Sequence, residues 1–540
     1  MCGRYVVKNP VTKTNKLVKS AIQVEDTENY NAHPYQKLPV IKKYKNGNTL
    51  ENLQWGLVPG WAKDKDFKAL INARLETIDE KVSFKKLIKN YRCVAVADGF
   101  YEWKREEKEK TPHYFTREDT NPIYFAGIFE NDQFCLITEE AKENINNLPE
   151  SKECIRLDNE IIIPGLINSH CHAADSLFRG LVENLSLEDW LQEVWKAEKA
   201  ILNPETTLLG SYLGLAENLL AGVTTVVDMF WYPFETANAS LDLGLRLCTG
   251  GIFIDFPGVG GRTHEQYLVE ASDFCSKFNN SEFIIPAVMP HGSYTVGPEH
   301  LQEAKKIASD FKAIFSIHAA ETIFEQKDIK SRYGNTVIRH LDKLGLLDEK
   351  ALLAHCVHLD NGEMDIIKAT NSVIAHNPLS NLKLGSGIAP TLDFLEKEIN
   401  VTLGTDGAIS GNDLDMWLTM RLAATLPKGK LMKPDIVTAK DVFQMATING
   451  AKALGKSSEI GSLEIGKQAD MVIISANSLH SVPLFDPLTH LVYSCSKSDV
   501  KHVYIAGKQC VKDGSIINFD IENVIQEVRK LKMPTLNSLL

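Results

Sequence analysis

Apolar runs that end in polar residues recur along the second part of the chain. The first run is Ile161–His172, which reads IIIPGLINSHCH and ends in two histidines. An apolar run of this kind predicts a single strand buried on both faces. Side chains two apart on a strand share a face, so His170 and His172 can point toward one place. Two such imidazoles can bind a divalent metal, although in a chain with 15 histidines they are as readily ordinary polar residues.

Five later runs repeat the pattern, each with a polar or ionisable residue where the run ends. They are FIIPAVMPH with His291, AIFSIHAAE with His318 and Glu321, ALLAHCVH with His355, SVIAHN with His376, and VTLGTD with Asp406. Helical-looking segments separate the runs, which indicates repeated βα units. The C-terminal strand ends of a closed parallel barrel meet at one mouth, so we expect these side chains to share one site.

Seven stretches carry a resemblance to a known family: PGLINSHCHAADSLFRGL, AGVTTVVDM, MPHGSYT, IHAAET, LLAHCVHLD, HNPLSNLKLGSGIAP and GTDGAISGNDLDMW. Through them, residues 161–517 resemble the amidohydrolase superfamily, in the branch of the adenosine, S-adenosylhomocysteine and methylthioadenosine deaminases and the related chlorohydrolases. The resemblance implies an α/β fold, with a metal-dependent (β/α)8 barrel at 161–450. The strands of a partial β-sandwich and a tail would follow at 451–540.

The resemblance also implies a mechanism. One divalent metal, zinc or alternatively iron or manganese, would be bound by His170, His172, His318 and Asp406. Asp406 would take a proton from the attacking water, Glu321 would protonate the ring nitrogen and the leaving ammonia, and His355 would stabilise the attacking oxygen. This is hydrolytic deamination of an adenosine-type nucleoside. Dechlorination of an aminotriazine is the nearest alternative, because the same attack serves either leaving group.

Three further residues match substrate-contacting positions of these deaminases. Trp190 and Glu198, in SLEDWLQEVWKAE, would contact the nucleoside and its ribose hydroxyls, and His291 in MPHGSYT would contact the substrate. The apolar spacing around Trp190 equally fits a plain amphipathic helix. Histidines outside such motifs are expected on the surface, among them His264, His300 and His340.

The first part of the chain differs in charge and chemistry. Residues 1–100 carry 18 Lys and Arg against 10 Asp and Glu, whereas the whole chain has a net charge of −11. A basic segment suits a polyanionic partner or is simply a solvated surface. Once Met1 is removed, Cys2 would present an amine and a thiol on adjacent carbons, both with pKa values of about 8. Such a pair condenses with an aldehyde, although a cysteine at the second position is usually incidental.

The stretches MCGRY, WGLVPGWAKD, INARLETI, RCVAVADGFYEWK and TPHYF give this part a second resemblance. Residues 1–145 resemble the SOS response-associated peptidase (SRAP) family, whose members crosslink to abasic sites in single-stranded DNA, and a mainly β, α+β fold is implied. Cys2 would be the nucleophile, Asn72 would orient the sugar or the amine, and Glu102 would transfer protons. DNA contacts would come from Arg4 and Arg74 on phosphate and from Trp55 or Trp61 on an unpaired base.

Both resemblances are incomplete at the junction, residues 146–160. SRAP domains continue into a catalytic histidine followed by Arg-Met-Pro, whereas here FCLITEEAKENINNLPE runs directly into SKECIRLDNEIIIPGL. The strands that precede the barrel in the deaminase branch are reduced to Cys154–Ile163. Their partner strands at 469–475 and 500–514 are present, so an exposed sheet edge is expected unless the SRAP part covers it.

Composition limits the remaining choices. A chain of 540 residues exceeds one domain, and 44% hydrophobic with 24% charged residues is ordinary for a protein with a large core. No run reaches the roughly 20 apolar residues that cross a bilayer, and the start lacks the apolar core of a signal peptide. Ten scattered cysteines are typical of reduced thiols, which favours a cytoplasmic location. The oligomeric state is left open.

Three functional hypotheses follow. The first is a metal-dependent nucleoside deaminase fused to an SRAP module. The second is a DNA-damage protein that acts through Cys2 and carries the barrel as a passenger. The third is a non-productive fusion of two truncated halves. Bound metal favours the first hypothesis, crosslinking to abasic DNA favours the second, and proteolysis at 145–160 favours the third.

Overall fold

The computed structural model describes residues 4–22, 24–44, 47–62, 67–106, 109–116, 122–138, 157 and 159–531. The chain forms two compact units, Met1–Ile155 and Arg156–Leu540. Cys2 lies outside the described residues, and only the backbone of Glu102 is described. Within the described ranges, none of the helices is both long and apolar enough to cross a bilayer. The eight cysteines of these ranges are buried and unpaired.

The described part of the first unit consists mainly of strands. Four strands form one sheet in the order β3-β1-β8-β9, and seven form another in the order β2-β5-β4-β7-β10-β11-β6. Two short helices, α1 (Pro10–Thr14) and α2 (Leu87–Asn90), accompany them. The strands are β1 (Arg4–Lys8), β2 (Ser20–Ile22), β3 (Glu28–Ala32), β4 (Lys37–Tyr44), β5 (Gly47–Trp55), β6 (Asn72–Arg74), β7 (Arg92–Ala97), β8 (Gly99–Glu106), β9 (Glu109–Thr116), β10 (Ile123–Glu130) and β11 (Gln133–Thr138).

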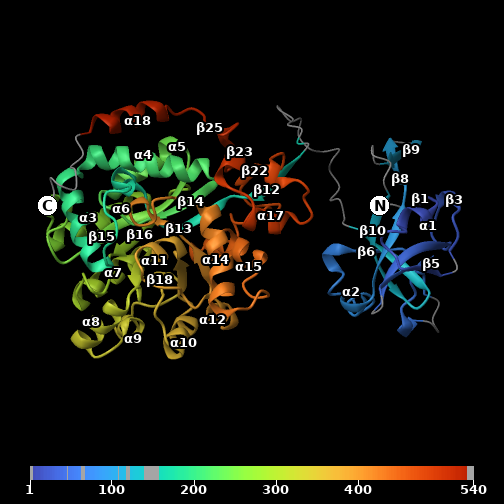
Figure 1. Ribbon diagram of the computed structural model, residues 1–540, viewed down its shortest axis with the longest axis horizontal. Helices are drawn as coiled ribbons and strands as arrows, with labels where there is room; N and C mark the ends of the chain where they lie inside the picture. The colour runs from blue at the N-terminus through green and yellow to red at the C-terminus, as the bar shows by residue number, and fades with distance from the viewer. Residues whose placement is uncertain are drawn as a thin grey trace. The chain divides into compact units, whose positions relative to one another are not determined.

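The second unit is built around a closed parallel barrel (Figure 1). Every two neighbouring strands of the barrel run parallel to each other. The last strand is split, and its first half pairs with β19 while its second half pairs with β13, which closes the ring. The strands are β13 (Leu166–His172), β14 (Val223–Asp228), β15 (Arg246–Phe253), β16 (Ile284–Pro290), β17 (Ile314–Ala319), β18 (Ala351–His355), β19 (Val373–His376), β20 (Val401–Leu403) and β21 (Asp406–Gly407). The predicted two-part architecture with a C-terminal barrel is confirmed.

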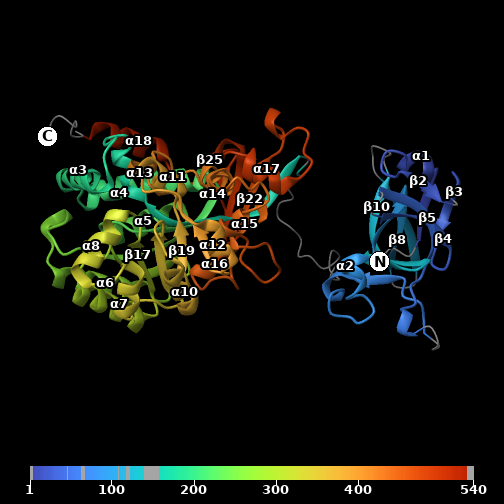
Figure 2. The ribbon, with the colours of Figure 1, turned by 60° about the horizontal axis from the view of Figure 1, so that its bottom comes forward.

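Helices surround this barrel, as the turned view shows (Figure 2). Their starts are set by local caps: the Ser186 side chain caps α3, and Asn203 with Thr206 forms a capping box at α4. The helices are α3 (Leu187–Ile201), α4 (Pro204–Leu220), α5 (Pro233–Leu243), α6 (His264–Phe278), α7 (Pro298–Phe311), α8 (Ile323–Tyr333), α9 (Val337–Lys343), α10 (Asn361–Thr370), α11 (Pro378–Lys383), α12 (Thr391–Glu396), α13 (Ala408–Gly411), α14 (Met416–Leu431), α15 (Ala439–Met445) and α16 (Ile448–Ala453).

A smaller sheet, in the order β12-β22-β23-β24-β25, joins the barrel. Arg246 of β15 is buried and donates hydrogen bonds to Asp470 and Gln468, so the barrel and this sheet share a buried ion pair. Helix α18 (Ile521–Lys530) lies along α4, and α17 (Pro487–Tyr493) lies close to the smaller sheet (Figure 1). The strands are β12 (Glu160–Pro164), β22 (Met471–Ser475), β23 (Val500–Ile505), β24 (Lys508–Lys512) and β25 (Ser515–Ile516).

The prediction of one strand over Ile161–His172 is wrong. The run divides at Gly165: β12 pairs antiparallel with β22, and β13 enters the barrel. Pro164 has no N–H to donate to a continuing ladder. A Cβ at Gly165 would lie 2.0 Å from Oγ1 of Thr224, so only glycine lets the backbone pass there. One apolar run therefore supplies strands to two sheets.

Candidate metal centre and active site

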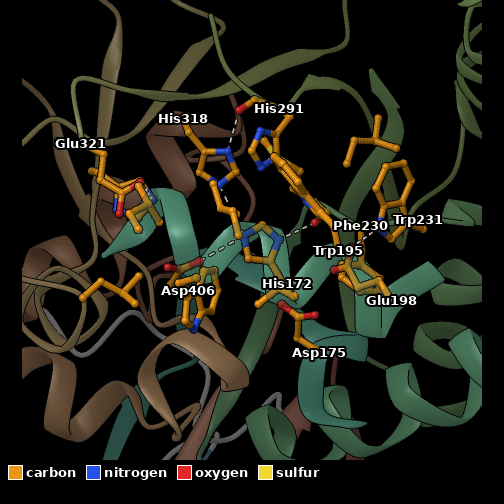
Figure 3. A pocket seen from close by; sticks show the side chains of 18 of the residues that line it. His172, Asp175, Trp195, Glu198, Phe230, Trp231, His291, His318, Glu321 and Asp406 are labelled. Carbon is orange, nitrogen blue, oxygen red and sulfur yellow. Dashed lines mark hydrogen bonds and ion pairs between the residues drawn. The ribbon is translucent and has the colours of Figure 1, made fainter. Parts of the chain in front are cut away.

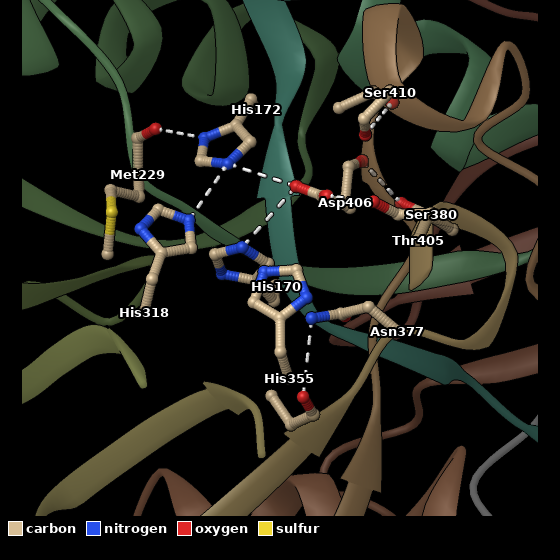
Figure 4. A network of polar contacts seen from close by, with 12 residues as sticks. His170, His172, Met229, His318, His355, Asn377, Ser380, Thr405, Asp406 and Ser410 are labelled. Carbon is tan, nitrogen blue, oxygen red and sulfur yellow. Dashed lines mark hydrogen bonds and ion pairs between the residues drawn. The ribbon is translucent and has the colours of Figure 1, made fainter. Parts of the chain in front are cut away.

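Four histidines and one aspartate meet at the C-terminal ends of the barrel strands (Figure 4). His170 and His172 come from β13, His318 from β17, His355 from β18 and Asp406 from β21. Oδ1 of Asp406 lies 3.1 Å from Nε2 of His172 and 3.5 Å from Nε2 of His170. Nε2 of His318 lies 3.4 Å from Nε2 of His172. The structure thus brings together five residues from the ends of four separate apolar runs.

Hydrogen bonds behind this cluster orient its side chains. Nδ1 of His172 donates to the carbonyl of Met229 at 2.5 Å, and Nδ1 of His318 donates to the carbonyl of His291 at 2.6 Å. Each of these bonds leaves Nε2 directed at the centre of the cluster. The hydroxyl of Ser380 donates to Oδ2 of Asp406 at 2.5 Å. Such outer contacts are what hold metal ligands in fixed orientations.

Two residues of the cluster have a backbone conformation that residues other than glycine rarely adopt. The φ angle is 75° at His355 and 63° at Asp406. Left-handed backbone at such residues costs on the order of 1–3 kcal/mol and is typical of functional sites. His355 is the last residue of β18 and Asp406 is the first residue of β21, so both lie where the chain leaves or enters a strand.

The cluster fits a divalent cation. His170 is buried and neither of its ring nitrogens has a hydrogen-bond partner. Burial lowers the pKa of His170 to about 4, which leaves a neutral imidazole with a free lone pair. Burial alone would raise the pKa of Asp406, but the imidazoles of His170 and His172 beside its carboxylate hold it well below its usual range. Ligand atoms of His170, His318, His355 and Asp406 lie within 4.8 Å of one another.

His172 shows that the cluster favours a positive charge. Burial lowers its pKa, but the hydrogen bond and the charge of Asp406 raise it more, to about 10. The cluster therefore stabilises one positive charge at its centre, and a divalent cation can take the place of the His172 proton. Imidazole nitrogens with one carboxylate oxygen are the donor set of zinc and related metals.

Glu321 lies beside the cluster, next to His355. Oε1 of Glu321 accepts a hydrogen bond from Ser386 at 3.2 Å, and Oε2 lies 3.6 Å from Nε2 of His355. Nδ1 of His355 donates to Oδ1 of Asn381 at 2.8 Å. Burial raises the pKa of Glu321, which favours the protonated carboxyl that a proton donor needs.

A pocket opens above the cluster, and the three expected substrate-contacting residues line it (Figure 3). Trp190 is buried in the pocket wall. Glu198 accepts a hydrogen bond from Nε1 of Trp231 at 2.9 Å, and burial raises its pKa to about 7. His291 is close to Oγ1 of Thr295, at 3.0 Å from Nδ1, and burial lowers its pKa to about 3. The pocket and the metal-ligand cluster are therefore parts of one site.

The sequence reasoning missed residues of this pocket, most clearly Asp175. Its carboxyl is buried, and Oδ1 has no hydrogen-bond partner. It lines the pocket beside Glu198 and His172 (Figure 3). Asp175 stands three residues after His172, and an acid among apolar residues at that place was the available signal. Trp231 gave no such signal, because a tryptophan in an apolar segment usually belongs to the core.

The residues of the first unit that are expected to contact DNA differ in accessibility. Arg4 and Arg74 are exposed, and Nη1 of Arg4 donates to Asn31 at 2.7 Å. Asn72 lies in β6, and its Oδ1 is buried without a hydrogen-bond partner. A buried amide oxygen of this kind is free to accept a hydrogen bond from a ligand.

Of the two tryptophans, only Trp61 has an accessible face. Its exposed fraction is 53%, whereas Trp55 is 0% exposed. Trp55 stacks on Phe134 with ring centroids 6.3 Å apart, and its Nε1 donates to the carbonyl of Ile71. Because its ring is packed in the core, Trp55 cannot stack on a base, and the expectation narrows to Trp61.

The expectation of three surface histidines is wrong for His340. This side chain is buried and stacks on Tyr333, with ring centroids 4.3 Å apart. His264 and His300 are half-buried and stack on each other.

A closed parallel barrel whose strand ends gather imidazoles and a carboxylate beneath a pocket defines a hydrolase-type metal centre. The family model described as the amidohydrolase family matches residues 161–510, and the chain belongs to this family. The model described as SOS response associated peptidase (SRAP) matches residues 1–157. Both resemblances inferred from the sequence are confirmed.

Relatives of the second unit are named as deaminases. The chain is 36% identical over 382 residues to 5-methylthioadenosine/S-adenosylhomocysteine deaminase 1 of Syntrophus aciditrophicus, covering 71% of this chain and 86% of the relative. It is 34% identical over 404 residues to the 5'-deoxyadenosine deaminase of Methanopyrus kandleri, covering 74% of this chain and 93% of that relative. A solved adenosine deaminase from Xanthomonas campestris with bound zinc is 29% identical, with a TM-score of 0.68, covering 76% of this chain and 93% of that one.

Proposed function

We propose that the second unit is a metal-dependent hydrolytic deaminase of an adenosine-type nucleoside, with S-adenosylhomocysteine, methylthioadenosine and adenosine as candidate substrates. The observation that carries this proposal is that His172, His318, Asp406 and Glu321 line one pocket, with Nε2 of His170 3.5 Å from Oδ1 of Asp406. Deaminase relatives covered over most of their length favour it over dechlorination of an aminotriazine.

The cofactor of the proposed enzyme is one divalent metal, with zinc the first candidate. His170, His172, His318 and Asp406 would hold it. When bound, the metal lowers the pKa of a water molecule and so supplies the nucleophile at neutral pH. The remaining steps belong to the residues of the chain.

Proton movements are assigned to two carboxyls that line the pocket. Asp406 has a strongly lowered pKa and is the ionised acceptor for a proton of the attacking water. Glu321 has a raised pKa and is the donor to the ring nitrogen. The resulting carboxylate then takes the remaining proton of the added water and relays it to the amino group, which leaves as ammonia. The proton held by Asp406 is released to solvent, from which Glu321 is protonated again. His355, held by Asn381, stabilises the attacking oxygen.

Substrate recognition is assigned to the pocket wall. Glu198 is the acceptor for ribose hydroxyls, because one of its oxygens already takes the Trp231 hydrogen bond and the carboxyl lines the pocket. The indole of Trp190 and the imidazole of His291 contact the nucleoside.

The test combines metal content with ammonia release from the three nucleosides and from 5'-deoxyadenosine. We expect about one metal in the proposed centre and ammonia from at least one substrate. Glu321→Gln should keep the metal and lose roughly 100-fold or more in kcat, since a general acid contributes that much. Glu398→Gln is the control, because Glu398 has an 85% exposed side chain. A metal-loaded chain that releases chloride from an aminotriazine but no ammonia would overturn the proposal.

We propose a second activity for the first unit, capture of abasic sites in single-stranded DNA through Cys2. The SRAP match over residues 1–157 supports it, as do the exposed Arg4 and Arg74 and the unpartnered amide oxygen of Asn72. An abasic oligonucleotide should give a denaturant-resistant adduct that Cys2→Ala abolishes and Glu321→Gln leaves unchanged. An intact oligonucleotide is the control, and an adduct that persists in Cys2→Ala argues against this role. The cytoplasmic location stays a prediction.

A further inference from the structure

We propose that Asp255, His264 and His300, with Glu303 as a fourth ligand, form a second divalent-metal site. These four residues are called the rim cluster. Asp255 follows the C-terminal end of β15, His264 begins α6, and His300 and Glu303 lie in the first turns of α7. None of them belongs to the centre described above.

The distances within the rim cluster suit one shared cation. One ligand atom from each of Asp255, His264 and His300 lies within 4.8 Å of the others. Nδ1 of His300 is 2.7 Å from Oδ1 of Asp255, and Nε2 of His264 is 2.5 Å from Oε2 of Glu303. The two imidazoles lie nearly parallel, with ring centroids 3.4 Å apart and an interplanar angle of 15°. Two imidazoles and the Asp255 carboxylate are thus gathered in one small region, and the Glu303 carboxylate lies beside His264.

The supporting structure holds these ligands in position. Oδ2 of Asp255 accepts a hydrogen bond from the backbone N–H of Gly297 at 2.6 Å, so the carboxylate is fixed by the loop before α7. His300 and Glu303 are three apart on one helix and share a face. The ligands come from three separate elements, so a bound metal would join the loop after β15 to the starts of α6 and α7.

The donor set indicates which metals the rim cluster would take. Two imidazole nitrogens with carboxylate oxygens suit Zn²⁺, Ni²⁺ and Co²⁺ better than Ca²⁺ or Mg²⁺, which prefer oxygen ligands. His264 and His300 are half-buried and Asp255 is exposed, so metal and water can reach the site. The alternative is two separate ion pairs, Asp255 with His300 and Glu303 with His264, and metal binding distinguishes the two arrangements.

The rim cluster is connected to the wall of the active-site pocket. Phe256, next to Asp255, packs on Trp195 of α3 with ring centroids 4.7 Å apart. Trp195 lines the pocket, and its ring lies 5.9 Å from that of His291. A metal in the rim cluster would therefore fix the loop that supports this wall, which is a structural role rather than a catalytic one.

The experiment measures the number of metal ions bound by the full chain. The metal-loaded protein is dialysed against Zn²⁺ in the micromolar range, and protein-bound zinc is then determined. We expect about two equivalents for the unchanged chain, about one for the double variant His264→Asn/His300→Asn, and about one for His170→Asn/His172→Asn. Asp255→Asn is a second variant, which should weaken the same equivalent. His480→Asn should keep both, because its partner Asp499 is a single carboxylate.

These variants separate failure of this inference from failure of the proposed deaminase. One equivalent in the unchanged chain that only His170→Asn/His172→Asn removes would overturn the rim cluster and leave the catalytic centre intact. Two equivalents that persist in His264→Asn/His300→Asn would also overturn it. With Co²⁺ in place of Zn²⁺, loss of one set of visible absorption bands in the rim variants should accompany the loss of one equivalent.

Discussion

Asp406 connects the metal-ligand cluster to its support, because its two oxygens face different partners. Oδ1 faces His170 and His172, and Oδ2 takes the hydroxyl of Ser380. The carboxylate cannot rotate without losing one set of contacts. At the scale of single residues, the site therefore depends on carboxylate oxygens held in fixed positions. Asp175 supplies a further carboxylate oxygen to the pocket.

Asp175 predicts a measurable contribution to substrate binding. Its Oδ1 is buried in the pocket wall without a hydrogen-bond partner, so a substrate hydroxyl or amine can donate to it. Asp175→Leu should lower kcat/KM by roughly 2- to 13-fold, the equivalent of about 0.5–1.5 kcal/mol for one lost hydrogen bond. Asp175→Asn keeps an acceptor oxygen and should stay near the unchanged chain. Metal content should not change in either, and equal kcat/KM in all three proteins would exclude the contact.

Glu325 predicts a stability that depends on pH. This buried carboxyl accepts a hydrogen bond from the N–H of Glu321, and burial raises its pKa from 4.5 to about 8. Because the folded-state pKa is above the unfolded value, the protonated carboxyl stabilises the fold in full below about pH 4.5. That stability is lost as the pH rises toward 8, at up to about 1.4 kcal/mol per pH unit.

Glu325→Gln should remove this dependence, because glutamine does not titrate. The free energy of unfolding of the variant, minus that of the unchanged chain, should increase progressively between pH 5 and pH 8, so that the variant becomes relatively more stable. The exposed substitution Glu398→Gln should show no such trend. Parallel pH profiles for the unchanged chain and Glu325→Gln would mean that the Glu325 carboxyl is ionised in the folded protein.

At the scale of elements, the sequence predicted the strands better than their assignment to sheets. Each apolar run with a polar end became a barrel strand, because burial on both faces requires an uninterrupted apolar segment. The apolar pattern did not show the division at Gly165, because no polar residue interrupts the run there, although the amidohydrolase resemblance had already set Cys154–Ile163 apart from the barrel. The centre residues were predictable because they end strands, whereas Asp175 follows the strand, where no periodicity marks it. His340 sits in α9, where it is buried and stacks on Tyr333.

Gly165 predicts a stability effect at the point where the chain passes from one sheet to the other. A Cβ there would lie 2.0 Å from Oγ1 and 2.4 Å from Cγ2 of Thr224, so Gly165→Ala must displace packed atoms. Overpacking of this kind costs about 1–3 kcal/mol. Gly429→Ala is the matched control, because Gly429 is an exposed residue of α14 with no atom within 4 Å of the added Cβ. That change should stabilise the helix by about 0.5–1 kcal/mol.

Denaturant unfolding of the two variants checks this prediction, with metal content measured in parallel. Gly165→Ala should lower the midpoint and Gly429→Ala should leave it equal or higher. If Gly165→Ala is as stable as the unchanged chain, the backbone there has room to move, and the division between β12 and β13 does not depend on glycine.

At the scale of the whole molecule, the candidate centre lies entirely in the second unit. The first strand of that unit, β12, completes its smaller sheet. Every residue of the metal-ligand cluster and pocket falls within residues 156–540. Strand β12 pairs with β22 from Glu160 to Pro164, and the N–H of Gly165 donates to the carbonyl of Asp470. The apolar segment just before the barrel therefore protects one edge of the smaller sheet.

Two truncations test this arrangement. Residues 156–540 contain β12, so this fragment should fold, bind the centre's metal and keep the kcat/KM of the full chain. Residues 166–540 lack β12, so the N–H and C=O groups of β22 would form an exposed edge, which favours aggregation. Buried Ile163 would also be lost from the core. We expect the shorter fragment to show a lower unfolding temperature and concentration-dependent association in sedimentation experiments. Aggregation of both fragments would instead show that residues 1–155 are required for folding of the barrel.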